Sequence, residues 1–387
     1  MTEPAVRRAS APHLFSALIA CALPIAILCG GRVLAIHLEK KTIHTTAPQD
    51  FFIKNEGLAF QRTAARTPDV LLLYGSSELT DPIPNRASDY FSREPSGFQV
   101  CPVGRAATTS LNVLQKLGAL GSDLRGRKVA ILLSPSSFLT PAVSPYSYAG
   151  NFSLPAASNM LFGDALDWRL KTEIARRMSE FPDTLARSEL LEVAASCLTS
   201  GHPIDRLVLM AVWPLGKLQN IVLDLQDHFE ALVYLLGERK PISRGSLPLF
   251  TAHNTRAGES KKTAGNRSAP SDQSASDTAF RARVAAASEW IDLELLFRTL
   301  SELKAQPLIL AMPIDGSRYD AQGISRSARQ IYYNKLRKLA QRYQFSLIQF
   351  EDHDSDPAFL IAHREHPSPK GWMYYDRALD DFFHQTK

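Results

Sequence analysis

Five apolar residues followed at once by a Gly-Ser-Ser turn constrain this chain more than any other stretch. Residues 70–74 read Val-Leu-Leu-Leu-Tyr, and Gly75, Ser76, Ser77 and Glu78 come directly after them. A short apolar run that ends in a turn is typical of a buried parallel strand. Because open α/β sheets bind ligands at the carboxyl ends of such strands, Ser76 and Ser77 are candidate site residues. The alternative is structural: either serine would cap the next helix, with Glu78 supporting its N-terminus.

A histidine 289 residues after Ser77 supplies the second half of a candidate catalytic pair. His366 opens a His-Pro-Ser-Pro loop just before a stretch with apolar residues at helical spacing. A serine early and a histidine late is the chain order of several α/β serine hydrolases. A serine hydroxyl is a weak nucleophile without a base in reach, and its reaction needs donors for the developing oxyanion. We therefore predict Ser77 as nucleophile and His366 as base, with backbone N–H groups of the first turn and of Gly104 as oxyanion donors.

The order of strand, polar turn and helix recurs along the chain. Apolar runs at residues 98–103 and 128–133 again end in turns, and leucines at helical spacing follow the first of them. Such a repeat is the pattern of βαβ units, so we predict an α/β fold in which helices flank a parallel sheet. The expected strands are residues 70–74, 98–103, 128–133, 307–312 and 345–350, and the expected helices include 168–178, 285–304, 325–343 and 370–384.

The N-terminal region predicts a membrane anchor. Residues 14–31 carry no charge and are almost wholly apolar, which approaches the ~20 residues that cross a bilayer. Arg7 and Arg8 before this segment favour an N-terminus in the cytoplasm. A cleaved signal peptide is the alternative, because residues 18–21 (Leu-Ile-Ala-Cys) are similar to a lipoprotein cleavage box, although the apolar run continues beyond them. The expected organisation is a cytoplasmic tail at 1–13, a single-pass plasma-membrane anchor at 14–36, a stalk at 37–60 and an extracytoplasmic catalytic domain at 61–387.

Composition excludes several classes of protein. With 387 residues and 45% hydrophobic content, the chain can bury one large core or two modest ones. A net charge of +5 without a basic-aromatic motif disfavours a nucleic-acid partner. Four cysteines make no disulfide framework, since Cys21 and Cys29 fall in the apolar segment and leave only Cys101 and Cys197 to pair. No His/Cys cluster has metal-ligand spacing, so we predict neither a metal nor another cofactor.

Two segments depart from the repeating pattern. Residues 251–279 contain no Leu, Ile, Val, Met, Phe, Tyr or Trp, so we predict a disordered insertion within one domain. Residues 221–236 are apolar at helical spacing but include Asp224, Asp227 and His228. These charges predict a packed or interfacial helix rather than a second membrane span.

Several motifs, taken together, resemble one family. They are residues 75–79 (Gly-Ser-Ser-Glu-Leu), 134–135 (Ser-Pro) before Phe138, 151–153 (Asn-Phe-Ser), 312–316 (Met-Pro-Ile-Asp-Gly) with Tyr319, and His366 with 370–372 (Lys-Gly-Trp). In order and spacing they resemble the DltD family, over about residues 10–385 with a break at the predicted insertion. The early Gly-x-Ser, the glycine after the second strand and the late histidine also resemble the wider SGNH hydrolase superfamily.

This resemblance implies a function and a set of partners. It implies an SGNH-hydrolase-like domain, with Ser77 at the position of the nucleophile, His366 at that of the base and Gly104 at an oxyanion position. It further implies transfer of D-alanyl groups to hydroxyls of an anionic, teichoic-acid-type envelope polymer outside the membrane. The family works beside a membrane-bound O-acyltransferase, while a ligase and a D-alanyl carrier protein supply the amino acid from the cytoplasm.

Two departures from the family pattern affect the site. The aspartate that usually lies three residues before the histidine is replaced here by His363. Ser136 is shorter than the polar side chain that often follows the Ser-Pro turn, which weakens its assignment to the oxyanion. We nevertheless include Ser76 and Ser136 among the candidate oxyanion or substrate-binding residues.

The residue that orients His366 has to be sought elsewhere. A catalytic imidazole needs an acceptor on its far nitrogen, which fixes the tautomer and stabilises the imidazolium. Asp352, Asp354 and Asp356 follow the last strand closely enough to reach the histidine loop, whereas Glu365 is expected to point away. We predict Asp354 as the orienting acid, with His363 as the alternative. A merely solvated aspartate loop is the structural interpretation.

Three functions follow from these residues. The leading one is an acyltransferase that works through an acyl-enzyme on Ser77. An esterase or thioesterase would use the same serine and histidine, with water as the acceptor. A non-catalytic scaffold for a partner acyltransferase is the third, and the histidine at position 363 keeps it open.

Overall fold

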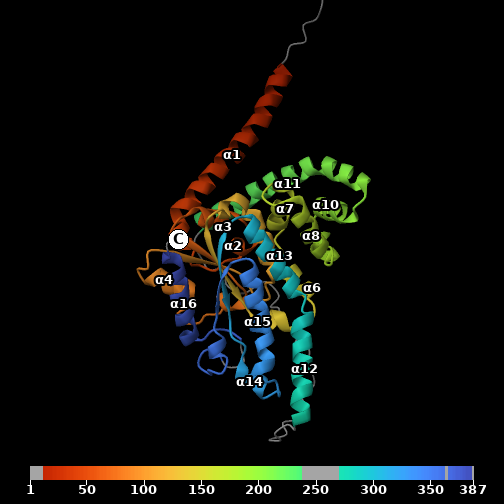
Figure 1. The fold of residues 1–387 in the computed structure, drawn as a ribbon. Coiled ribbons are helices and arrows are strands. Elements are labelled where there is room, and N and C mark those ends of the chain that lie inside the picture. Colours follow the sequence, from red (N-terminus) through yellow and green to blue (C-terminus); the bar gives the residue numbers. More distant parts are fainter. Residues whose placement is uncertain (1–11, 238–269, 362–364, 386–387) are drawn as a thin grey trace, which may run out of the picture.

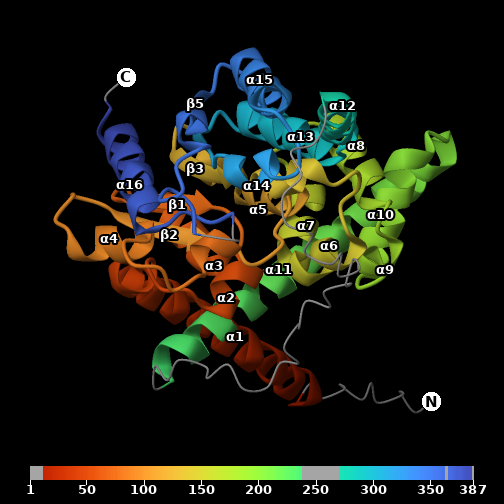
Figure 2. The ribbon, with the colours of Figure 1, turned by 90° about the horizontal axis from the view of Figure 1, so that it is seen from below.

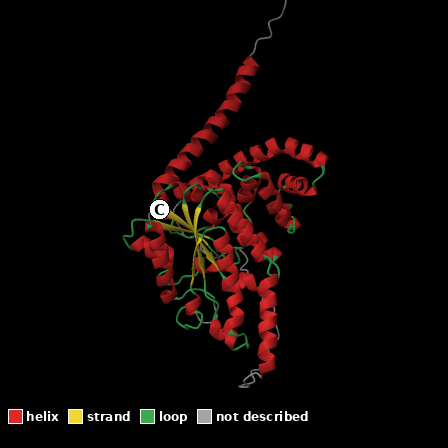
Figure 3. Cartoon of the chain, in the orientation of Figure 1, coloured by secondary structure: helices red, strands yellow, loops and turns green. Residues whose placement is uncertain are grey.

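Five parallel strands form a sheet at the centre of the computed structural model, which describes residues 12–237, 270–361 and 365–385 (Figure 3). The strands lie in the order β2-β1-β3-β4-β5, and every neighbouring pair is parallel. The predicted α/β fold with a parallel sheet is therefore confirmed. The strands are β1 (Val70–Tyr74), β2 (Gln99–Val103), β3 (Lys128–Leu133), β4 (Gln306–Ala311) and β5 (Ser346–Gln349).

Alternate residues of each strand face two separate cores. Leu72 and Tyr74 of β1 belong to the larger core, whereas Leu71 and Leu73 belong to the smaller one. A strand that is covered on both faces has this period of two, which explains why β1 is an unbroken apolar run. Figure 2 shows the sheet between these two layers of helices.

The helices that cover the sheet divide between its faces. Those of the larger core include α3, α5, α13 and α15, and those of the smaller core are α4 and α16. Helices α7, α8 and α10 extend the larger core on one side of the molecule. The helices are α1 (Pro12–Thr46), α2 (Phe52–Glu56), α3 (Ala59–Arg66), α4 (Ala87–Arg93), α5 (Ser110–Leu120), α6 (Pro145–Asn151), α7 (Leu154–Phe162), α8 (Trp168–Met178), α9 (Pro182–Leu185), α10 (Glu189–Ser200), α11 (Pro203–Leu236), α12 (Pro270–Ala286), α13 (Glu289–Glu302), α14 (Gly316–Asp320), α15 (Arg326–Arg342) and α16 (Pro369–His384). Short 3-10 turns are η1 (Ser77–Leu79), η2 (Gly121–Leu124), η3 (Pro135–Leu139) and η4 (Glu351–His353).

Helix α1 projects out of the domain at its N-terminal end and packs on it at the other (Figure 1). Its residues 15–30 are exposed, whereas Ala35, Glu39, Ile43 and Ala47 are buried at a spacing of four. The predicted stalk at residues 37–60 is therefore wrong. This four-residue spacing gives the second half of α1 a face that packs on the body, and the chain continues from there into α2 and α3.

Two helices of the described chain are long and apolar enough to cross a membrane. The first spans Phe15–Thr46 within α1 and is the candidate for the predicted anchor. The second is α11, which crosses α1 in both Figure 1 and Figure 2 and packs along the helical part of the domain.

The structure describes only the last part of the predicted insertion. Residues 251–269 lie outside the described residues, but residues 270–279 begin helix α12, so the prediction of disorder is wrong there. Helix α12 is held because Phe280 and Val284 reach the larger core. In addition, Asp277 accepts hydrogen bonds from the backbone N–H and the hydroxyl of Ser325, at 2.7 and 2.6 Å. All four cysteines of the chain are free.

Candidate active site

The turn after β1 is built over a buried glutamate. The Glu78 side chain folds back, and its Oε1 accepts a hydrogen bond from the backbone N–H of Ser76 at 2.6 Å. A Cβ atom at position 75 would lie 2.4 Å from that oxygen, so only glycine permits this approach. Burial raises the pKa of Glu78, and the backbone N–H groups that bond it act in the opposite direction. The Gly-Ser-Ser-Glu stretch thereby forms a fixed turn with Ser77 at the start of η1.

Ser77, His366 and Asp81 form a hydrogen-bonded chain beyond the carboxyl end of β1. Ser77 Oγ lies 2.8 Å from Nε2 of His366, and Asp81 Oδ2 lies 2.7 Å from Nδ1 of the same ring. The imidazole and the carboxylate are 17% and 22% exposed, so water and substrate can reach a largely enclosed pair. The structure thus brings the predicted nucleophile and base within hydrogen-bond distance. The order of contacts is that of a serine hydrolase triad.

Asp81 is the functional residue that sequence reasoning missed. It lies four residues after Ser77, and the turn folds back so that its backbone N–H donates to the Ser77 carbonyl oxygen at 3.2 Å. A spacing of four across a helical turn places two side chains on the same side, so the sequence did contain a signal.

The loop that carries His366 is clamped at both ends. Leu360 and Pro367 form an antiparallel bridge, and the N–H of Ile361 donates to the carbonyl oxygen of His366 at 2.9 Å. Ser368 caps α16, because its Oγ accepts a hydrogen bond from the N–H of Gly371 at 3.1 Å. These contacts fix the backbone on both sides of the imidazole.

Asp354, which was predicted to orient His366, lies against another partner. Its carboxylate accepts a hydrogen bond from the Arg329 guanidinium at 3.3 Å, and both side chains are almost fully buried. Its backbone carbonyl accepts a bond from the N–H of Gly316 at 2.7 Å. The physical reason for this placement is that the buried Arg329 needs a counter-charge, while Asp81 already occupies Nδ1 of His366. The alternative, His363, lies outside the described residues.

Gly104 also has a different role from the expected one. Its N–H donates to Oδ1 of Asn55 at 2.8 Å, so this donor is already engaged. A Cβ atom at position 104 would lie 2.1 Å from the carbonyl oxygen of Gly75, which explains the glycine by the close approach of two strand ends. By contrast, no acceptor within the described residues bonds the N–H of Ser77. That N–H is a backbone donor left available beside the Ser77 hydroxyl, where a developing oxyanion would need one.

Of the two serines predicted beside the pair, one bonds the backbone and the other borders the histidine loop. The Ser76 hydroxyl donates to the carbonyl oxygen of Arg105 at 3.3 Å, which ties the turn to the loop after β2. The Ser136 hydroxyl lies 2.8 Å from that of Ser134 and close enough to the Glu365 carboxylate to act against the rise of its pKa. Glu365 was expected to point away from the His366 ring, and the hydrogen-bond partners of that ring are Ser77 and Asp81. Burial raises the pKa of Glu365, and Arg318, 3.6 Å from it, acts in the opposite direction.

Comparison with known proteins assigns the chain to a family. The sequence profile described as DltD protein matches residues 52–275 and 260–384, which is most of the chain. The chain belongs to the DltD family. It is 25% identical over 348 residues to Protein DltD of Bacillus subtilis (strain 168), which covers 86% of this chain and 87% of that protein. It is 22% identical over 324 residues to Protein DltD of Staphylococcus aureus (strain NCTC 8325 / PS 47), with 79% of each chain covered.

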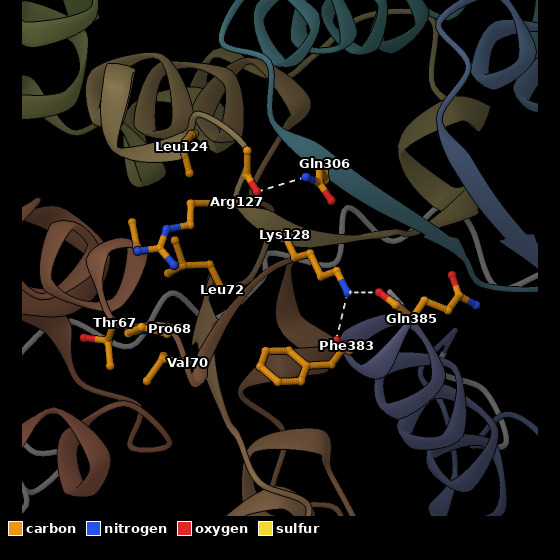
Figure 4. A pocket seen from close by; sticks show the side chains of 12 residues that line it. Thr67, Pro68, Val70, Leu72, Leu124, Arg127, Lys128, Gln306, Phe383 and Gln385 are labelled. Atoms are coloured by element: carbon orange, nitrogen blue, oxygen red, sulfur yellow. Dashed lines mark hydrogen bonds between the residues drawn. The ribbon is translucent and has the colours of Figure 1, made fainter. Parts of the chain in front are cut away.

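One hollow of this DltD-family chain lies at the opposite edge of the sheet from Ser77. About 370 Å³ in volume, it opens at the amino ends of β1 and β3 and is lined by Val70, Lys128 and Gln306, among others (Figure 4). The Lys128 ammonium there donates to the carbonyl oxygens of Phe382 and Phe383, both at 2.8 Å, and so caps the end of α16. At the carboxyl edge, a hollow beside Ser76 measures only about 20 Å³, enough for a single water molecule. The hollow beside Ser76 therefore offers too little volume to enclose an organic ligand.

Metal ligands do not gather in the part of the DltD-family chain that the structure describes. No group of three or more His, Cys, Asp and Glu side chains is placed there to hold an ion. What the site contains is a hydroxyl, an imidazole and a carboxylate in hydrogen-bond contact, which is a set of groups that moves protons.

Proposed function

We propose that this chain is a membrane-anchored O-acyltransferase that transfers D-alanyl groups to hydroxyls of an anionic envelope polymer outside the cytoplasm. The observation that carries the proposal is the contact of Ser77 Oγ with His366 Nε2 at 2.8 Å, with Asp81 behind the ring. Membership of the DltD family supports the D-alanyl group and the teichoic-acid-type acceptor. The long apolar α1 supports the anchor.

The reaction would proceed in two half-steps. In the first, Ser77 Oγ attacks the carbonyl carbon of an activated D-alanyl donor, and His366 Nε2 takes the hydroxyl proton. The oxyanion accepts the Ser77 N–H, and the leaving group departs with the proton from His366. In the second, a polymer hydroxyl gives its proton to His366 and attacks the D-alanyl ester, which releases Ser77 with its proton restored. Asp81 keeps Nδ1 protonated and stabilises the imidazolium in both steps.

The partners follow from the same family membership. A carrier protein and a ligase would charge D-alanine in the cytoplasm, and a membrane-bound O-acyltransferase would bring it across the bilayer to Ser77. The chain would thus receive the acyl group at the outer surface and needs no cofactor of its own.

Two other functions use the same fold. An esterase or thioesterase would have the same triad but pass the acyl group to water. The histidine at position 363 kept a non-catalytic scaffold open as a third function, and Asp81 at Nδ1 of His366 weighs against it. Because a decayed site gives no reason to retain this contact, we favour the enzyme.

The test is to trap the acyl group on the serine. Membranes that contain the chain and its donor pathway are fed isotope-labelled D-alanine, quenched in acid, and digested for mass spectrometry of the peptide that contains Ser77. We expect a labelled D-alanyl ester on Ser77 in the wild-type protein, and a loss of polymer labelling by several orders of magnitude in Ser77→Ala. Ser76→Ala is the matched control and is expected to retain much of the transfer. A folded Ser77→Ala protein that still labels the polymer fully would refute the covalent mechanism, and release of free D-alanine in place of polymer labelling would assign an esterase.

A further inference from the structure

Helix α11 carries an apolar stripe that the domain does not cover. Within it, Ile204, Leu207, Leu215 and Leu218 are 71%, 67%, 52% and 57% exposed. Steps of three and four residues put them on one side of the helix. The apolar residues on this side of the helix are Ile204, Leu207, Val208, Ala211, Pro214, Leu215, Leu218, Val222, Leu225, Phe229, Val233 and Leu236. We call these residues the α11 stripe.

The opposite side of α11 is fixed to the domain. Asn220 accepts a hydrogen bond from the Ser158 hydroxyl at 2.7 Å, and the backbone of Gly216 approaches the Phe162 ring so closely that a Cβ would overlap it. Asp227 accepts from the backbone N–H groups that begin α3. If α11 crossed a bilayer, these buried contacts would be pulled from their partners. The helix is therefore held on the domain surface with one face packed and one face free.

Helix α1 fixes where a bilayer would lie. Its exposed part, residues 15–30, spans about 24 Å at 1.5 Å per residue, which is most of the ~30 Å thickness of a hydrocarbon core. At the end of that part, Gly31 packs under the ring of Phe229, and Arg32 pairs with Asp224 at 2.9 Å. Phe229 belongs to the α11 stripe, so the stripe meets α1 at the level where α1 leaves the membrane. Figure 1 shows α11 running across the top of the domain, transverse to α1.

We propose that the α11 stripe lies in the outer boundary of the bilayer that α1 spans, as an interfacial helix. Lipid is what covers the α11 stripe, because the stripe is uncharged, meets the apolar part of α1 and is about as long as α11 itself. A soluble monomer rarely leaves so large an apolar patch in water. A helix with a free apolar face at a membrane surface sinks about 5–10 Å into the region between headgroups and acyl chains. Two non-parallel contacts, α1 and α11, then fix the orientation of the domain on the membrane. The proposal is independent of the chemistry at Ser77.

The test measures depth in a lipid bilayer with the full chain. In a background with Cys21, Cys29, Cys101 and Cys197 replaced by alanine, Leu218→Cys carries an environment-sensitive fluorophore. The matched control is Ile291→Cys on α13, which is 58% exposed against 57% for Leu218 but lies outside the stripe. Both proteins are reconstituted into phosphatidylcholine vesicles with spin labels at the 5- or 12-position of the acyl chain, and unfolding temperatures verify the fold.

We expect the emission of the label at position 218 to be blue-shifted. The spin labels should quench it several-fold more than they quench the label at position 291. The spin label at the 5-position should quench it more than the one at the 12-position. Equal, weak quenching at both positions would show that the stripe faces water and would overturn the proposal. A blue shift at 218 without lipid quenching would mean that a second copy of the chain covers the stripe. Stronger quenching from the 12-position would mean that α11 enters the bilayer deeply. A blue shift without lipid quenching, or stronger quenching from the 12-position, would therefore also overturn the proposal of an interfacial helix.

Discussion

Asp81 Oδ2 lies 2.7 Å from Nδ1 of His366, although 285 residues separate the two in the chain. This contact decides which nitrogen of the ring faces the serine as an acceptor. With the proton of Nδ1 held by Asp81, Nε2 carries a lone pair toward Ser77 Oγ, 2.8 Å away. The carboxylate and the hydroxyl come from the same short turn, so one turn supplies both partners of the imidazole.

The first prediction concerns this carboxylate. Asp81→Asn keeps the size of the side chain but removes its charge and its preference for a protonated Nδ1. We expect the rate of acyl-Ser77 formation to fall by a factor on the order of 10²–10⁴, with little change in the unfolding temperature. Quenched-flow labelling with isotopic D-alanine measures the rate.

Asp354→Asn is the matched control. It leaves the buried Arg329 with a weaker counter-charge, so we expect a lower unfolding temperature and an almost unchanged rate per folded molecule. If Asp354→Asn were the variant that lost the rate, and Asp81→Asn kept it, the assignment of the acid would be reversed.

The parallel sheet could be predicted from the sequence because its signals are local. Strands β1 and β3 were predicted at their observed bounds, and β2, β4 and β5 within one residue at each end. Short apolar runs that end in polar turns carry this information without any knowledge of the rest of the chain. The pairing of Ser77 with His366 could be predicted for the same reason, since both residues lie in loops that follow the carboxyl ends of strands in one sheet.

What the sequence did not predict depends on contacts between distant residues. The role of Asp354 was decided by Arg329, and that of Gly104 by Asn55 and by the Gly75 backbone. Nothing local distinguishes a glycine that donates to an oxyanion from one that lets two strand ends approach. Likewise, α12 is helical because its far end reaches the core at Phe280, whereas the polar part by itself resembles a disordered segment.

The second prediction separates these two roles of Gly104. In Gly104→Ala the new Cβ would lie 2.1 Å from the carbonyl oxygen of Gly75, so the strand ends must move apart. We expect a loss of a few kcal/mol in the free energy of unfolding, measured by chemical denaturation. Gly150→Ala is the control, since its Cβ meets nothing within 4 Å, and its stability should be unchanged or slightly higher. A Gly104→Ala protein with normal stability and no activity would restore the oxyanion role.

The third prediction concerns topology. If α1 spans the membrane with its N-terminus in the cytoplasm, an alkaline phosphatase reporter joined after Lys387 by a flexible linker should be exported and active. The same reporter placed before Met1 should be inactive. Activity at the N-terminal position with none at the C-terminal one would reverse the orientation of the domain.

The last prediction concerns Asp376, on the buried side of α16. Neither of its carboxylate oxygens has a hydrogen-bond partner within the described residues, and burial raises its pKa to about 8. Between the unfolded value near 3.8 and this folded value, the native state binds more protons than the unfolded state. Stability therefore falls as the pH rises through this window, because ionisation in the core is unfavourable.

Asp376→Asn mimics the protonated carboxyl and cannot ionise. We expect the variant to be more stable than the wild type by only about 1–2 kcal/mol at pH 5, about one unit above the unfolded pKa, and by clearly more at pH 8.5. The difference should reach a few kcal/mol, since one pKa unit corresponds to about 1.4 kcal/mol. Denaturation curves at both pH values measure this difference. The contributions of other buried acids, such as Glu289 with its pKa of about 8, are present in both proteins and cancel in the comparison. An Asn variant that is equally destabilised at both pH values would show that Asp376 is ionised and paired in the native protein.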